Sequence, residues 1–240
     1  MPWLYNLADI RGYDSIIPRQ YTEYMAAIEP QNGLPFNRIQ PLGSPAAGDS
    51  PLLDALAVKY IVSAEPIVSH KLRPVWEGEG VVIYENLAAA PRAYTLPRSA
   101  EVHAPDALAA LTEYDPRFFV VIESDEAAAG EALPGDPNPA LIAGSSNNEV
   151  IVSATVAEPS WLVLGDSFFP GWRAYVRPAG TGEDSESEVE ITRVNANFRG
   201  VRLEPGDWMV RYRYSPRSFQ LGGLMSFMGV IVLIFILGVW

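Results

Sequence analysis

The residues that most resemble a catalytic nucleophile are Gly165-Asp166-Ser167, directly after the apolar run 161–164. A serine in a tight turn after a buried strand is placed as a nucleophile, and it needs a histidine base within hydrogen-bonding reach. The chain has two histidines, His70 and His103, and both lie far upstream of Ser167. Because no base accompanies the serine, we assign no catalytic residue.

Patterns for metal and phosphate ligands are not found in the sequence either. The two histidines stand singly and the chain contains no cysteine, so no zinc site is predicted. An acidic run comprises Glu183, Asp184, Glu186 and Glu188. Its spacing does not match a calcium-binding loop, and it predicts a solvated surface loop. No glycine-rich phosphate-binding motif occurs, and we expect no cofactor.

Four aromatic side chains are candidates for stacking on sugar rings: Trp161, Trp172, Tyr175 and Trp208. Flat apolar faces stack on pyranose rings, but a period of two along strands fits the core of a sandwich at least as well. Trp172 and Tyr175 are the candidate glycan or lipid-headgroup contacts. A shared, solvent-facing position of these two side chains would favour glycan contact, whereas full burial would favour a core role.

Arginines are the candidate contacts to anionic groups. Arg92 follows Pro91 and is expected either at a domain interface or near an anionic lipid-linked donor. Arg211, Arg213 and Arg217 lie just before the last apolar run, where they either contact lipid headgroups or are simply solvated. Basic flanks are typical of the cytoplasmic side of a span, so these three arginines count against an extracytoplasmic domain.

Residues 221–240 are apolar apart from Ser226 and four glycines, and no other stretch of similar length lacks charge. A helix rises about 1.5 Å per residue, so about twenty residues span the roughly 30 Å of the hydrocarbon core. This run therefore predicts a transmembrane helix. Because no polar flank follows it and the N-terminus lacks a signal-peptide pattern, we expect upstream spans in a longer parent protein.

Composition narrows the classes of partner. The chain has 17 Lys and Arg against 29 Asp and Glu, a net charge of −12. Such a surface repels phosphate backbones, so no nucleic-acid partner is expected. The absence of cysteine excludes a disulfide framework.

The elements that would position these residues begin with an irregular, turn-rich segment, 1–51, with one short helix from Arg19 to Ile28. Residues 52–123 alternate helical and β-branched runs and predict a small α+β unit. Its expected helices lie at 52–57 and 107–111, with a buried strand at 60–62 and further strands at 81–84, 93–96 and 118–122.

Residues 124–148, rich in small and polar residues, predict a linker or surface loop. Residues 149–215 predict an antiparallel β-sandwich, because short alternating runs are separated by turn residues. Its six expected strands lie within 150–156, 161–164, 172–176, 189–194, 201–203 and 208–214. The expected fold is an α+β unit followed by an antiparallel β-sandwich and a C-terminal transmembrane helix.

Five segments occur in an order that resembles one bacterial family: ADIRGYDS (8–15), LLDALAVKYIVS (52–63), VVIYENLAAAPRAY (81–94), WLVLGDSFFPGWRAYV (161–176) and FRGVRLEPGDWMVRYRYSPRSFQLGG (198–223). Together they are similar to the C-terminal extracytoplasmic region of the YfhO-type membrane proteins. The resemblance covers most of the chain apart from 124–148 and 178–188.

The resemblance implies a polytopic, glycosyltransferase-like parent that uses polyprenyl-phosphate sugars to glycosylate cell-envelope polymers. The catalytic acid of such transferases lies in an early loop with no counterpart here, so no catalytic residue is carried over. The implied role is a noncatalytic extracytoplasmic domain in the cell membrane, with membrane lipid, envelope glycan or lipid-linked sugar, and upstream spans as partners. The alternative is a structural or protein-interaction module of an envelope complex.

Overall fold

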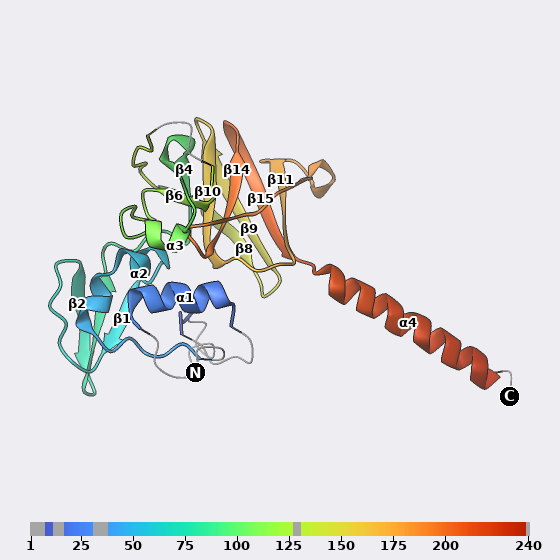
Figure 1. Ribbon diagram of the computed structural model, residues 1–240, viewed down its shortest axis with the longest axis horizontal. Helices are drawn as coiled ribbons and strands as arrows, with labels where there is room; N and C mark the ends of the chain where they lie inside the picture. Colours follow the sequence, from blue (N-terminus) through green and yellow to red (C-terminus); the bar gives the residue numbers. More distant parts are fainter. Residues whose placement is uncertain (1–7, 12–16, 31–37, 127–130, 239–240) are drawn as a thin grey trace.

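The computed structural model describes residues 8–11, 17–30, 38–126 and 131–238. A β-sandwich lies between a smaller N-terminal unit and one helix that projects at the C-terminus (Figure 1). The mixed α+β content, the antiparallel sheets and the apolar C-terminal helix expected from the sequence are confirmed. Outside the described residues lie 1–7, 12–16 and 31–37 of the turn-rich segment, 127–130 of the predicted linker and 239–240 of the predicted span.

Helix α1 (Arg19–Ile28) has the predicted bounds. Pro18 precedes its first turn, where a missing N–H sacrifices no intrahelical hydrogen bond. Tyr24 and Met25 are fully buried, and the Tyr24 hydroxyl donates to the Leu52 carbonyl at 3.0 Å. The helix is therefore fixed to the segment that follows it, which contains η2 (Pro45–Asp49) and α2 (Pro51–Ala55).

A three-stranded antiparallel sheet follows, with the order β1-β3-β2. Its strands are β1 (Tyr60–Ser63), β2 (Leu72–Gly78) and β3 (Val81–Asn86). The prediction that the first strand is buried was wrong, because Tyr60 and Val62 are exposed on a face that no described element covers. The β-branched run indicated the strand but not which face would be covered.

Two larger sheets form the sandwich. One has seven strands in the order β5-β6-β13-β14-β10-β4-β7, and the other has five in the order β12-β11-β15-β9-β8. The seven-stranded sheet comprises β4 (Ala93–Pro97), β5 (Glu101–Ala104), β6 (Val120–Glu123), β7 (Asn138–Pro139), β10 (Ser160–Ser167), β13 (Thr192–Val194) and β14 (Phe198–Leu203). The five-stranded sheet comprises β8 (Leu141–Ser145), β9 (Glu149–Val156), β11 (Trp172–Pro178), β12 (Ser187–Val189) and β15 (Gly206–Tyr214).

Strand pairing departs from the predicted division of the chain. Strand β4, expected in the α+β unit, pairs antiparallel with β10 of the sandwich, with Leu96 opposite Trp161. Strands β5 and β6 also join the seven-stranded sheet, and they form its parallel pair. Part of the predicted linker forms β7 and β8. The sandwich therefore extends from β4 to β15, since apolar residues of β4, β5 and β6 share a core with those of β10, β13 and β14.

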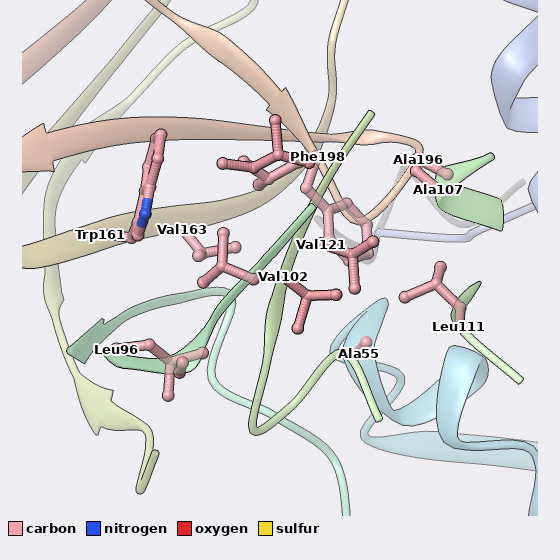
Figure 2. Close-up of a cluster of buried hydrophobic side chains, with 14 of the residues drawn as sticks. Ala55, Leu96, Val102, Ala107, Leu111, Val121, Trp161, Val163, Ala196 and Phe198 are labelled. Carbon is pink, nitrogen blue, oxygen red and sulfur yellow. The ribbon is translucent and has the colours of Figure 1, made fainter. Parts of the chain in front are cut away.

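The seven-stranded sheet is covered on both faces. Along β10, Trp161 and Val163 point into one core, and Leu162 and Leu164 point into the other. Figure 2 shows the first core, in which Trp161, Val163 and Phe198 lie in the same cluster as residues of α2 and of the α3 segment (Ala107–Ala110). The second core lies between the two sheets. Burial on both faces explains the continuous apolar run 161–164.

The single strand expected at 189–194 is divided between the sheets. Strand β12 pairs with β11, whereas β13 pairs with β14 and β6. Between them the chain crosses from one sheet to the other, so Val189 and Val194 lie in different sheets. Apolar spacing alone did not reveal this crossover.

Helix α4 (Arg217–Gly238) follows β15 after only two residues. It has a mean hydropathy of 2.5 and none of it is buried, so it is long and apolar enough to span a membrane. It begins four residues before the predicted start at Leu221, because Arg217 to Gln220 form its first turn. Among the described residues it is the one helix with these properties.

Candidate functional site

Trp172 and Tyr175, the two candidate sugar contacts, lie on opposite faces of β11. Trp172 faces the inter-sheet core, where its ring centroid is 5.4 Å from that of Tyr214. Tyr175 faces outward, with the Arg211 guanidinium 4.9 Å above its ring centroid. Residues three apart on a strand have opposite parity, so the two rings cannot form one platform. Both side chains are half-buried.

The other two aromatic candidates are structural. Trp161 is fully buried, and its Nε1 donates to Glu101 at 2.8 Å. Trp208 packs at the edge of the inter-sheet core and donates from Nε1 to the Glu204 carbonyl at 2.7 Å. These contacts favour the core interpretation for both side chains.

Arg92, the candidate contact to an anionic donor, forms a bidentate ion pair across the seven-stranded sheet. Its Nε and Nη2 donate to the two carboxylate oxygens of Asp166 at 2.8 and 2.9 Å. The Arg92 carbonyl also accepts from the Gly165 N–H at 2.8 Å. Because the guanidinium remains partly exposed, Arg92 combines a structural contact with one accessible cationic edge.

A second arginine, Arg199, lies beside this pair and was not singled out from the sequence. Its side chain is 6% exposed, and its guanidinium stacks 3.7 Å above the ring centroid of Trp172. Nε donates to the Ser167 carbonyl at 3.0 Å, but Nη1 is 3.9 Å from Asp166 and has no hydrogen-bond partner in the described part of the chain. Burial lowers the pKa of Arg199 to about 10.

The sequence does carry a signal for the inward position of Arg199, which is its alternation with apolar residues along β14. Arg199 alternates with Val201 and Leu203, and both of those side chains are in the inter-sheet core. An arginine in register with two core positions is therefore directed inward at the end of the strand. Two neighbouring polar groups are also buried without a partner among the described residues, the Asn197 amide and the Tyr212 hydroxyl.

In the acidic run predicted to be a solvated loop, Glu183, Asp184 and Glu188 are exposed as expected, but Glu186 packs against an arginine of β15. Glu186 accepts from Arg211 Nε at 3.0 Å, and its side chain is 5% exposed. Glu149 lies 3.4 Å from Arg211 Nη1. These contacts lower the pKa of Glu186, chiefly through the hydrogen bond from Arg211. The loop is therefore attached to the sheet, which the spacing of its carboxylates did not indicate.

A cavity of about 360 Å³ lies where the N-terminal unit meets the segment between α3 and β6, and it is lined by Asp49, Pro51, Asp54, His70, Lys71, Leu87, Ala88, Asp115 and Arg117. Its centre is a closed ionic network. Lys71 Nζ donates to both oxygens of Asp54 at 2.7 and 2.8 Å, Asn86 Nδ2 donates at 2.8 Å, and Arg117 Nη1 lies at 3.1 Å. With its acceptors occupied, Asp54 is placed for structure and not for catalysis.

Neither histidine forms a hydrogen bond with Ser167 in the described part of the chain. His103 Nε2 lies 2.7 Å from Glu101, and His70 is exposed at the cavity rim. Among residues 8–11, 17–30, 38–126 and 131–238, no three His, Asp or Glu side chains are grouped to hold a metal ion. The described geometry therefore assembles no nucleophile with its base.

Comparisons with protein-family models, with curated proteins and with solved structures found no match for this chain.

Proposed function

We propose that this chain is the noncatalytic extracytoplasmic domain of a polytopic, YfhO-like membrane protein that supports glycosylation of cell-envelope polymers from lipid-linked sugars. The proposal rests on the five segments that resemble that family and on the direct connection between sandwich and helix. Strand β15 ends at Tyr214 and α4 begins at Arg217, so two residues separate them. Such a short link holds the domain at the bilayer surface, where the phosphate of a lipid-linked sugar lies.

The connection to α4 is the observation that carries the proposal. The Ser215 N–H donates to the Gly171 carbonyl at 2.8 Å, which attaches the link to the turn between β10 and β11. The Arg92–Asp166 pair and the outward-facing Tyr175 belong to strands of the same sandwich. Tyr175 is the better candidate for stacking on a sugar, because Trp172 packs between Tyr214 and Arg199.

The side of the membrane is tested by labelling a single cysteine in the full-length protein. Ser185 lies exposed in the acidic loop, and this chain contains no cysteine of its own. Ser185→Cys, in a cysteine-free parent, is treated in intact cells with a membrane-impermeant maleimide, with the outer membrane permeabilised where there is one. We expect labelling without lysis. Labelling only after lysis places the domain in the cytoplasm and overturns the proposal.

Ala174→Cys is the matched control, because Ala174 is fully buried on β11. It reacts only when the domain is unfolded, so it shows that labelling at position 185 reports access to folded protein. Detergent lysis of the same cells gives the total reactive fraction for Ser185→Cys, and lysis in denaturant gives it for Ala174→Cys. The ratio of the two signals is the measurement.

One surface favours the alternative, a protein-interaction module. Across the three-stranded sheet, Val62, Ile83 and Trp76 lie in one row, and Val62 and Trp76 are exposed. Contiguous apolar surface of this kind is typical of protein–protein contacts. Val62→Ser combined with Trp76→Ser is expected to leave glycan transfer by the parent unchanged. Loss of a co-purifying envelope protein together with loss of transfer would favour the interaction module.

A further inference from the structure

We propose that the turn 168–171, between β10 and β11, is a second membrane contact. It places Phe169 and Pro170 in the interfacial layer of the bilayer that α4 enters. The partner is the lipid surface itself, and this inference does not depend on the role proposed in glycosylation.

The position of the turn next to α4 is the first observation. The Ser215 N–H donates to the Gly171 carbonyl at 2.8 Å, and Gly171 has a φ of +106°. A Cβ added to Gly171 would lie 3.0 Å from a ring of Tyr214 and from the Pro216 side chain. The turn therefore packs on the residues that link the sandwich to the helix, including Pro216, which directly precedes α4.

The turn is held in place by four hydrogen bonds to three segments of the chain, so its exposed tip has a defined position. The Phe168 N–H donates to the Asn197 carbonyl at 2.6 Å, and Gln20 of α1 donates to the Phe168 carbonyl at 2.5 Å. Arg199 donates to the Ser167 carbonyl, and Ser215 to the Gly171 carbonyl. Contacts that fix both ends of a turn preorganise the side chains between them.

The tip is apolar although it is exposed. Phe169 is 37% exposed and Pro170 is exposed, while the main chain around them is hydrogen-bonded. In a soluble domain, a lone exposed phenylalanine needs no explanation. Here the turn that carries it packs on Pro216, the residue before a helix whose described side chains are all exposed. Phenylalanine on the apolar face of an interfacial segment is buried at the boundary between the lipid headgroups and the acyl chains.

Charge at this end of the sandwich suits an anionic lipid surface. Arg213 lies near the end of β15 and Arg217 in the first turn of α4. Neither has a carboxylate within ion-pair distance among the described residues, in contrast to Arg211, which pairs with Glu186. A basic side chain near the surface is attracted to anionic headgroups. The aromatic turn and the two cations thus present complementary contacts to one interface.

The test uses environment-sensitive labels on single cysteines, introduced one at a time into the full 240-residue chain. Phe169→Cys reports the tip, and Ala179→Cys is the matched control. Ala179 is exposed and hydrogen-bonded to Asp207, so it lies at the opposite end of β15, about 27 Å away along the strand. Each labelled chain is reconstituted into phosphatidylcholine vesicles with and without phosphatidylglycerol.

We expect the label at position 169 to emit at shorter wavelength and to be quenched at least threefold more by nitroxide-bearing lipids than the label at 179. Equal quenching at both positions would overturn the proposal, because the tip would then lie in water. A second tip variant, Pro170→Cys, guards against local distortion by the first. Both tip labels must be quenched more than the control.

The charge contribution is tested on the same chains. Arg213→Gln with Arg217→Gln is expected to reduce quenching at position 169 in vesicles that contain phosphatidylglycerol and to leave it unchanged in phosphatidylcholine alone. Stronger tip quenching after removal of the arginines, in either lipid, would contradict the proposed geometry.

Discussion

Two clusters in this molecule place one aspartate between two cations, and they differ in how completely the charges are paired. In the N-terminal unit, Asp54 is 2% exposed and is contacted by Lys71, Arg117 and Asn86, all within 3.1 Å. At the end of the sandwich next to α4, Asp166 is 19% exposed and pairs closely only with Arg92. The other cation there, Arg199, is buried but keeps an unpartnered Nη1.

The two clusters differ in that the charges of the Asp54 network are fully paired, whereas the charge of Arg199 in the second cluster is not. In a buried ion pair each side chain neutralises the charge of the other, so removing one partner leaves an uncompensated buried charge. The Asp54 network joins α2, Lys71 just before β2, β3 and the segment after α3 in this way. In the second cluster the cation is stabilised mostly by the Trp172 ring and by the Ser167 carbonyl. The second cluster therefore supports the turn beside α4 while the Arg199 charge stays incompletely paired.

Asp54→Asn should have the largest effect. It leaves the buried Lys71 without a counter-ion, which costs about 3–5 kcal/mol of the free energy of unfolding, whereas Arg117 keeps its ion pair with Asp115. Urea denaturation of the whole chain in detergent micelles measures this loss. Asp49→Asn is the control, because Asp49 lines the same cavity but is exposed. Equal losses for both variants would contradict the closed network.

Arg199→Met should cost less, about 1–2 kcal/mol. The variant loses one hydrogen bond and the stacking on Trp172, but it also relieves the burial of an incompletely paired cation. The same denaturation measurement applies, with Arg202→Met as the control, because Arg202 lies over Trp161 and is largely exposed. A loss as large as that of Asp54→Asn would show that the two clusters do not differ.

The sequence predicted local elements better than their partners. Helix α1, and strands β9, β10 and β15, follow from periodicity and from turn residues. Periodicity says which face of a strand is buried but not which strand lies beside it. Strand β4 joins the sandwich through a pairing with β10 that spans more than sixty residues of chain, and no local pattern carries that information.

For the candidate site, the sequence indicated which residue types matter but not how their side chains are arranged in space. Arg92 was singled out, but its partner Asp166 lies 74 residues away and was considered only as part of a serine turn. Trp172 and Tyr175 were grouped as one platform although their spacing of three places them on opposite faces of a strand. Arg199 was missed, although its alternation with Val201 and Leu203 indicates an inward position.

A third ion pair, between Glu186 of the acidic loop and Arg211 of β15, is also expected to contribute to stability. Glu186→Gln should cost about 1.5 kcal/mol, the contribution of a charge-assisted hydrogen bond from Arg211. Because the folded state lowers the pKa of Glu186, this stability is present above the usual carboxyl pKa of 4.5 and is lost as pH falls through the lower, folded value.

Denaturation at neutral pH and at acidic pH tests this linkage. The wild-type chain and Glu186→Gln should differ at neutral pH and converge once the carboxyl is protonated. Glu188→Gln is the control, because Glu188 is about half exposed and pairs with Arg173 at the surface. A difference between wild type and Glu186→Gln that does not change with pH would contradict ionic attachment of the loop.

Phe169→Ser should have the smallest effect on stability and still be informative about the second cluster. The side chain is at the exposed tip of the turn that Arg199 and Asn197 hold, so the free energy of unfolding should change by less than about 0.5 kcal/mol. Phe198 is fully buried against Tyr24, so Phe198→Ser should instead cost more than about 3 kcal/mol. If Phe169→Ser destabilised the chain as much as Phe198→Ser, the tip would be part of the core, and the cluster beneath it would serve packing alone.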